Sequence, residues 1–221
     1  FVAVSGVLLF AGKGLTDSLL PEDVTLVSYG ASLVVSVLVL GVLGVLLYFT
    51  AVRPFVGRPG LAWVMSTIGF GIIIQNTALA IWGPSPMVLP SPLGDQVIRI
   101  GGAGVLPQEI LVLVSSVVVM VGLDLVLRRT KLGKAVRAVA QSRAAATLMG
   151  IDVSAIVVGA FVVSSALAGL AGLLIAPITT ASVFMGMTLA LKAFSAAIVG
   201  GLDNPRGCML GGFLLGLIEA L

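Results

Sequence analysis

Residues 24–50 read VTLVSYGASLVVSVLVLGVLGVLLYFT and contain no charged side chain. A helix needs about 20 apolar residues to cross the hydrocarbon core of a bilayer, which is about 30 Å thick. The stretch is long enough to do so, and it lacks the alternation of apolar and polar residues that marks a strand of a membrane barrel. It therefore predicts a transmembrane helix, which satisfies its own backbone hydrogen bonds in lipid.

The composition extends this prediction to the whole chain. Apolar residues make up 59% of the 221 residues and charged residues only 10%, against about a quarter charged in soluble domains, and the mean hydropathy is +1.22. Three more runs are strong candidate spans, at 61–82, 109–127 and 154–176. Three others are weaker candidates, at 1–12, 186–201 and 207–221. We expect an all-α polytopic helical membrane protein, with six or seven membrane segments in a single domain over residues 1–221. The chain begins without methionine and stops inside an apolar run, so we expect a fragment truncated at both ends.

Several kinds of chemistry lack their usual residues. The chain has no histidine, the commonest general base and metal ligand, so we expect neither a catalytic residue nor a metal site. Cys208 is the only cysteine and cannot form an internal disulfide. Gly12-Lys13-Gly14 lacks the rest of a nucleotide-binding glycine loop. If ATP drives this protein, the nucleotide must bind to another chain.

Basic residues gather in two of the links between the predicted spans. Links 51–60 and 128–150 hold eight of the twelve Lys and Arg residues, and no acidic residue lies between 125 and 151. The links at 13–23 and 83–108 hold two basic and four acidic residues. Because short cytoplasmic loops are enriched in Lys and Arg, the first two links should face the cytosol and the link 83–108 should lie outside.

Two stretches depart from ordinary spans and short links. The link 83–108 contains five prolines and cannot be one helix. We expect an external loop with a short extended segment at QVIRI (96–100), which serves as a connector or as a docking surface for something outside. The stretch 186–201 is short and carries Lys192 near its centre, so it either crosses fully or enters and turns back. The side of the link that follows it stays open, although Arg206 favours the cytosol.

Residues 131–150, KLGKAVRAVAQSRAAATLMG, interrupt the apolar sequence with a basic, alanine-rich segment. Apolar residues recur at helical spacing along one side: Leu132, Val136, Val139, Ala140, Ala144 and Leu148. Polar residues hold another side: Lys131, Lys134, Arg137 and Gln141. We expect one short amphipathic helix at the cytoplasmic surface that ends near Gly150. It is either an anchor on anionic lipid headgroups or, because its apolar side is made of small residues, a contact that transmits movement from a soluble partner.

Three motifs in the right order resemble the permeases of ABC importers. LGKAVRAVAQSRAAATLMGID (132–152) looks like their cytoplasmic coupling loop, in the version found in branched-chain amino-acid permeases. RPFVGRPGLAWVMSTIGFGIIIQN (53–76) is similar to the Arg-Pro loop of that family and the helix after it, which ends in Gln-Asn. ALKAFSAAIVGGLDNPRGCMLGGFLLGLIEAL (190–221) is similar to its Lys-Ala-Phe-Thr-Ala-Ala, Gly-Gly and Gly-Gly-x-x-x-Gly pattern. The matches run from about Ala51 to the last residue, roughly three quarters of the chain.

The resemblance implies a permease subunit of an ATP-driven importer in a prokaryotic inner membrane. Its expected partners are cytoplasmic ATPase subunits, a second permease subunit, an external substrate-binding protein and membrane lipid, but not nucleic acid. No cofactor is expected in this chain, because ATP and Mg would bind to the partner ATPase. The residues expected to couple to the ATPase are Lys134, Arg137, Ala138, Gln141, Ala144, Ala145 and Gly150.

The chain departs from the family pattern in two places. Many relatives carry an acidic residue in the middle of the coupling segment, where this chain has Gln141-Ser142-Arg143, so an ion pair between such an acid and the ATPase is in doubt. The Asn-Phe-Ala-His-Gly segment of the family's N-terminal helices has no counterpart in residues 1–30.

Polar side chains inside predicted spans are costly unless they face protein or a cavity. Gln75 and Asn76 could hydrogen-bond the two ends of a zwitterionic substrate, join neighbouring helices, or lie at the interface. Lys192 could attract a substrate carboxylate, pair with an acid such as Glu219 or Asp124, or extend toward the membrane surface. Asp124 is most simply a local partner of the two arginines that follow it. The candidate residues of a translocation pathway are Thr67, Gln75, Asn76, Lys192 and Ser195.

Pairs of glycines recur with spacings that place them on one face of a helix, which favours close helix packing. The candidates for such packing are Gly169, Gly172, Gly207, Gly211, Gly212 and Gly216.

The function expected from the resemblance is import of branched-chain amino acids, or of a related small polar solute such as urea, an amide or an aromatic acid. The alternative is an ion-coupled secondary transporter or a channel. That alternative needs a membrane-embedded carboxylate for coupling, and the acidic residues in the strong spans are Asp124 and Glu109, each close to one end. A membrane-embedded enzyme is also disfavoured, because the sequence has no paired carboxylates and no Ser/Lys arrangement at helical spacing.

Overall fold

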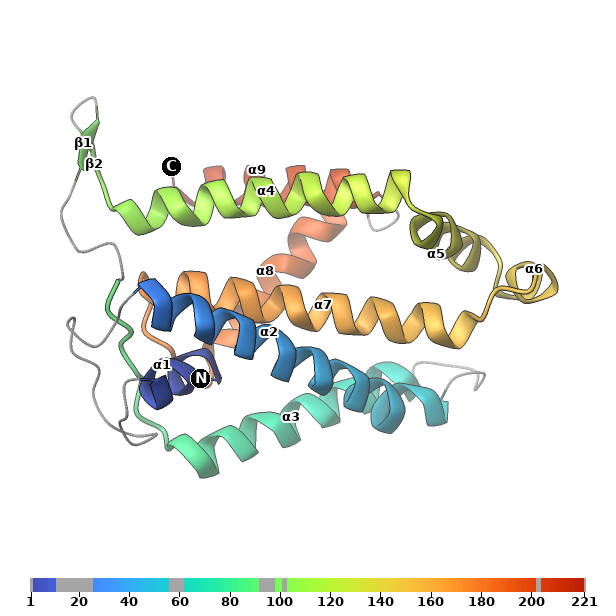
Figure 1. Ribbon diagram of the computed structural model, residues 1–221, viewed down its shortest axis with the longest axis horizontal. Helices are drawn as coiled ribbons and strands as arrows, with labels where there is room; N and C mark the ends of the chain where they lie inside the picture. Colours follow the sequence, from blue (N-terminus) through green and yellow to red (C-terminus); the bar gives the residue numbers. More distant parts are fainter. Residues whose placement is uncertain are drawn as a thin grey trace. The chain divides into compact units, whose positions relative to one another are not determined.

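The computed structural model describes residues 2–10, 26–55, 62–91, 98–100, 103–201 and 204–220. These residues are mainly helical, with one two-stranded antiparallel ribbon (Figure 1). The chain divides into two compact units, the first of residues 1–112 and 152–183 and the second of residues 113–151 and 184–221. The Gly12-Lys13-Gly14 stretch lies outside the described residues, as do five charged residues of the links discussed above: Asp17, Glu22, Asp23, Arg58 and Asp95.

All four strong candidate spans are helices in the structure. They are α2 (Leu26–Leu47), α3 (Ala62–Trp82), α4 (Pro107–Arg129) and α7 (Val153–Ile175), and each is long and apolar enough to cross a membrane. The weaker candidates also form helices, but shorter ones: α1 (Val2–Phe10), α8 (Met185–Gly200) and α9 (Pro205–Ala220). The predicted class of polytopic helical membrane protein is confirmed. Among the described residues it contains four helices of full spanning length, fewer than the six or seven segments expected.

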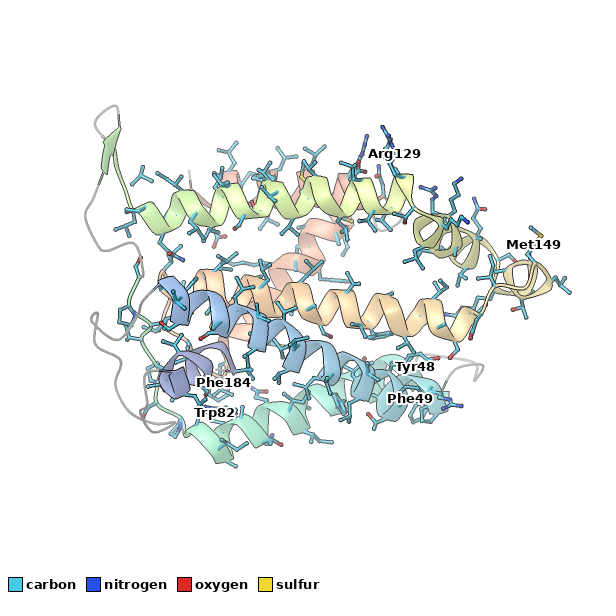
Figure 2. All side chains as sticks on the ribbon, viewed as in Figure 1. Tyr48, Phe49, Trp82, Arg129, Met149 and Phe184 are labelled. Carbon is cyan, nitrogen blue, oxygen red and sulfur yellow. The ribbon has the colours of Figure 1, made fainter. Side chains whose placement is uncertain are left out.

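The helical path of α2 continues beyond Leu47. It runs on through a π-helical turn, Tyr48–Val52, and a 3-10 turn, Arg53–Phe55. The ring of Phe49 lies edge-on to that of Tyr48, with centroids 5.4 Å apart, and the guanidinium of Arg53 lies 5.3 Å from the Phe49 centroid. Figure 2 labels both rings at this end of the helix. Aromatic rings and an arginine in contact are typical of the membrane–water interface.

In the first unit, α2 and α7 run antiparallel and pack side by side. Near the start of α2, the Tyr29 hydroxyl donates a hydrogen bond of 3.0 Å to the carbonyl oxygen of Leu173. Near its other end, the Tyr48 hydroxyl lies 3.1 Å from the hydroxyl of Ser154. These two bonds join opposite ends of the two helices and fix their register.

Small residues set how closely α2 and α7 approach. A Cβ atom placed on Gly44 would lie 2.8 Å from the carbonyl oxygen of Phe161, and one placed on Gly169 would lie 2.6 Å from the Leu40 side chain. Three serines one turn apart on α2, Ser28, Ser32 and Ser36, are buried as well. Small residues at a membrane helix contact let the backbones come close enough for van der Waals attraction to hold them.

The apolar core of the first unit contains residues of α1, of α2 and of the end of α7, together with Leu89 and Ala181. Its members are Val4, Val7, Leu8, Tyr29, Leu89, Leu173, Ala176 and Ala181. The buried side chain of Gln108, in the first turn of α4, donates a hydrogen bond of 2.9 Å to the carbonyl oxygen of Leu174. The start of α4 is thereby tied to the end of α7.

The proline-rich link between α3 and α4 has the extended segment that the sequence predicts. Strand β1 (Ile98–Ile100) pairs antiparallel with β2 (Ala103–Val105). Earlier in the same link, Met87 exchanges two backbone hydrogen bonds with Ala181, of 3.0 and 2.8 Å. The segment after α3 and the segment after α7 therefore lie at the same end of the first unit.

In the second unit, α8 and α9 form a tight helical hairpin. A Cβ atom on Gly211 would overlap the carbonyl oxygen of Ala196, and one on Gly207 would overlap that of Gly200. Gly201 follows α8 with a φ of +88°, a conformation that favours glycine. The hairpin therefore depends on backbone contacts that only glycine permits.

Candidate functional site

The basic segment forms two helices where the sequence predicts one. They are α5 (Lys131–Gln141) and α6 (Arg143–Leu148), separated at Ser142 (Figure 1). Ser142 is extended, and its hydroxyl accepts a hydrogen bond of 3.2 Å from the backbone N–H of Ala145. The prediction of one continuous amphipathic helix is wrong, because a serine that caps a new helix competes with continuation of the old one.

The predicted end of the segment at Gly150 is confirmed. Gly150 has a φ of +78°. Its N–H donates to the carbonyl of Thr147, and the N–H of Ile151 donates to that of Ala146, both at 3.0 Å. This pair of bonds is a Schellman motif, which terminates a helix. Asp152 then caps the first turn of α7. The segment therefore ends in a helix stop that is followed directly by the cap of the next span.

Most of the residues predicted to contact an ATPase lie on the surface. The side chain of Ala138 is half-buried, and the others are exposed: Lys134, Arg137, Gln141, Ala144, Ala145 and Gly150.

Two exposed apolar residues were not among those predictions. Leu148 is 90% exposed and Met149 is 81% exposed, and Figure 2 shows Met149 at the end of α6. The sequence places Leu148 on the apolar side that continues from α5, but the break at Ser142 interrupts that side. Adjacent exposed apolar residues next to exposed alanines mark a surface that contacts a protein or a membrane.

Gly133 holds α5 against the last turns of α4. It is buried, and a Cβ atom on it would overlap the backbone of Leu127. The hydroxyl of Thr130 donates a hydrogen bond of 2.6 Å to the carbonyl of Val126 and accepts one of 3.1 Å from the N–H of Gly133. Gly133 was not among the predicted site residues, although its spacing of three residues from a threonine is that of a helix N-cap.

Asp124 connects α4 with α9. The Nε and Nη2 atoms of Arg206 donate to its two carboxylate oxygens at 2.7 and 2.6 Å, and the Nε of Arg128 donates at 3.0 Å. The local partner predicted for Asp124 is therefore confirmed for Arg128, while the two-pronged contact with Arg206 was not foreseen. In the expected topology Arg128 lies at the cytosolic end of α4. The link between α8 and α9 is then expected on the cytosolic side as well, which is the side that the charge of Arg206 favours.

Lys192 forms an ion pair with Glu219 of α9, one of the partners that the sequence left open. Ser195, one turn further along α8, donates a hydrogen bond of 2.9 Å to the carbonyl of Leu191. The Lys192 and Glu219 side chains remain 44% and 55% exposed. The pair is therefore accessible within an otherwise apolar pair of helices.

The other predicted pathway residues belong to α3, in the first unit. Asn76 donates a hydrogen bond of 2.8 Å to the carbonyl of Ile72 in its own helix, while Gln75 and Thr67 are half-buried. Because Lys192 and Ser195 belong to the second unit, the five residues are divided between the two units.

The predicted packing glycines fall into two groups. A Cβ atom on Gly169, Gly207 or Gly211 would meet the neighbouring helix. One on Gly172, Gly212 or Gly216 would have nothing within 4 Å among the described residues. A packing role for the second group therefore has no support within the described part of this chain.

The spans and the capped segment between α4 and α7 define a polytopic membrane protein. A family model described as "Branched-chain amino acid transport system / permease component" matches residues 2–221, and the chain belongs to this family. It is accordingly a multi-pass protein of the inner membrane, and its family is one of transport components rather than enzymes.

Three relatives illustrate the range of similarity. The high-affinity branched-chain amino acid transport system permease protein BraD of Pseudomonas aeruginosa is 31% identical over 225 residues, which cover 100% of this chain and 71% of BraD. The LivH protein of Escherichia coli is 30% identical over 177 residues, 77% of this chain and 57% of LivH. A probable LivH protein of Methanocaldococcus jannaschii is 36% identical over 105 residues, 48% of this chain and 33% of that protein. No solved structure gives a significant match.

Proposed function

We propose that this chain is the permease subunit of an ATP-driven importer that carries branched-chain amino acids inward across the membrane. The observation that carries the proposal is the segment 130–152. It lies between two spans, is capped at both ends, and exposes Leu148 and Met149 at the end of α6. Exposed apolar residues on short helices held in place by caps suit a docking surface for a soluble protein.

Within the second unit, contacts lead from this segment toward the membrane helices. Displacement of α5 acts on α4 through the contact of Gly133 with Leu127. The same end of α4 holds α9 through Asp124 and Arg206, and α9 is packed on α8 through backbone contacts at Gly211. ATP binding to a partner would favour one position of α4, α5, α8 and α9, and would thereby shift the balance between inward-open and outward-open states.

The partners that this mechanism needs are supplied by other chains. ATPase subunits bind ATP and Mg and dock on α5 and α6, through the residues from Lys134 to Gly150 named above. A second permease subunit completes the pathway, and an external binding protein delivers the amino acid. The names of BraD and LivH, which state branched-chain amino acid transport, support this substrate class.

The test is uptake of radiolabelled leucine into proteoliposomes that contain the full-length permease, its second permease subunit and the ATPase subunits. With the binding protein outside and ATP inside, we expect uptake that stops when ATP is replaced by a non-hydrolysable analogue. Uptake that continues without ATP and is abolished by a protonophore would instead establish the ion-coupled transporter.

A further inference from the structure

Lys192 and Glu219 form a charged pair in helices that are otherwise apolar. Apart from this pair, the one charged residue in the sequences of α8 and α9 is Arg206, which is bound to Asp124. Lys192 is the eighth of the sixteen residues of α8. At a rise of about 1.5 Å per residue, Glu219 lies roughly 21 Å along α9 from its first residue. The pair therefore lies far from the turn of the hairpin.

The exposure of this pair is unusual for such a position. Both side chains are about half exposed, and their neighbours Leu191, Phe194 and Ile218 are exposed apolar residues. Charged groups inside a membrane are costly against lipid and normally face a protein interior or water. This side of the hairpin should therefore line a polar passage or an inter-subunit space.

We propose that the Lys192–Glu219 pair is a binding site for the zwitterionic end of the transported amino acid. Lys192 would bind the α-carboxylate and Glu219 the α-ammonium group, with the Ser195 hydroxyl, three residues from Lys192 on the same face, as a further hydrogen-bonding group. The inference rests on the proposed function, because it takes amino acids as the substrate.

The chemistry of a zwitterion fits a pair better than a single charge. An isolated charge in this position would bind one end of the amino acid and leave the other end desolvated and unpaired, which is costly. A salt bridge at rest neutralises itself, and a zwitterion can insert between its members so that each charge gains an opposite neighbour. The substrate can then leave without stranding a charge, because the salt bridge closes again.

The test separates substrate binding from a purely structural ion pair. Lys192→Glu combined with Glu219→Lys keeps a salt bridge but reverses its direction, so an amino acid held in the original orientation meets two like charges. We expect ATP-driven leucine uptake to fall about tenfold or more, while ATPase subunits still co-purify with the permease. A second variant, Lys192→Arg combined with Glu219→Asp, keeps the direction of the pair and should lose several-fold less uptake than the reversed pair.

Two results would overturn the inference. Recovery of wild-type uptake by the reversed pair would make the salt bridge structural. Equal loss in the reversed and the conservative pair would mean that any change here disrupts the hairpin. Failure of the proposed function is recognised separately, because the wild-type transporter itself would then show no ATP-driven uptake.

Discussion

Gly133→Ala is expected to lower ATP-driven leucine uptake about tenfold or more, although it adds only one methyl group. The new Cβ atom would overlap the backbone of Leu127, and backbone cannot move aside without shifting the last turn of α4. Overpacking of this kind costs about 1–3 kcal/mol or more, which would separate α5 from α4. Displacement of α5 by a partner would then no longer reach the membrane helices.

Gly122→Ala is the matched control for this experiment. It is the same chemical change in the same part of the chain, but no described residue lies within 4 Å of a Cβ atom at Gly122. Alanine is the better helix former, so uptake should stay within about twofold of wild type. Full activity of both variants would contradict the idea that the contact of Gly133 with Leu127 transmits movement from α5 to α4.

Gly211→Ala is expected to destabilise the α8–α9 hairpin by about 2 kcal/mol, while Gly212→Ala, one residue further on, leaves it unchanged or slightly more stable. A Cβ atom on Gly211 would overlap the carbonyl oxygen of Ala196, whereas one on Gly212 would meet nothing within 4 Å in the part of the chain that the structure describes. Cys208 provides the measurement, because its half-buried thiol lies 3.2 Å from the carbonyl oxygen of Gly201 at the turn of the hairpin.

The rate at which a maleimide dye labels Cys208 during heating reports opening of this hairpin. The Gly211→Ala variant should become reactive at a lower temperature than wild type, and Gly212→Ala should not. Identical labelling curves for the two variants would mean that the backbone contact at Gly211 does not hold the hairpin together.

The spans could be predicted from sequence because an apolar run long enough to cross a bilayer has few other uses. Residues 61–82, for example, became α3 (Ala62–Trp82) almost without change. The end of the basic segment was equally accessible, because Gly150 adopts the positive φ that its residue type allows most easily. In both cases the information is local in the sequence.

Contacts between distant residues could not be predicted in the same way. Arg206 and Asp124 are 82 residues apart, and nothing in their local sequences distinguishes this pair from other combinations of charges. The break at Ser142 was missed for another reason. The apolar spacing continues across it, so periodicity favoured one helix, while the serine cap decided otherwise.

The packing glycines show most clearly which contacts a sequence pattern cannot predict. Gly169 and Gly172 belong to one spacing pattern on α7, yet only Gly169 meets another helix among the described residues. Helical spacing identifies a face that is able to pack, but which turn of that face meets a neighbour depends on the crossing of the two helices. For Lys192, the sequence similarly gave a choice of partners that only the placement of α9 could narrow to Glu219.

The most direct test of this account is co-purification of the full-length permease with its ATPase subunits, in wild type and in a double variant, Leu148→Glu with Met149→Glu. Both side chains are exposed, so the double change should leave folding and membrane insertion intact. The control is Val88→Glu, which likewise places a carboxylate at an exposed apolar residue, in the link that is expected to lie outside. We expect the ATPase to co-purify with wild type and with the control, and to be lost from the double variant. An ATPase that binds the double variant as well as wild type, or that binds neither, would contradict the assignment of α5 and α6 as the coupling segment.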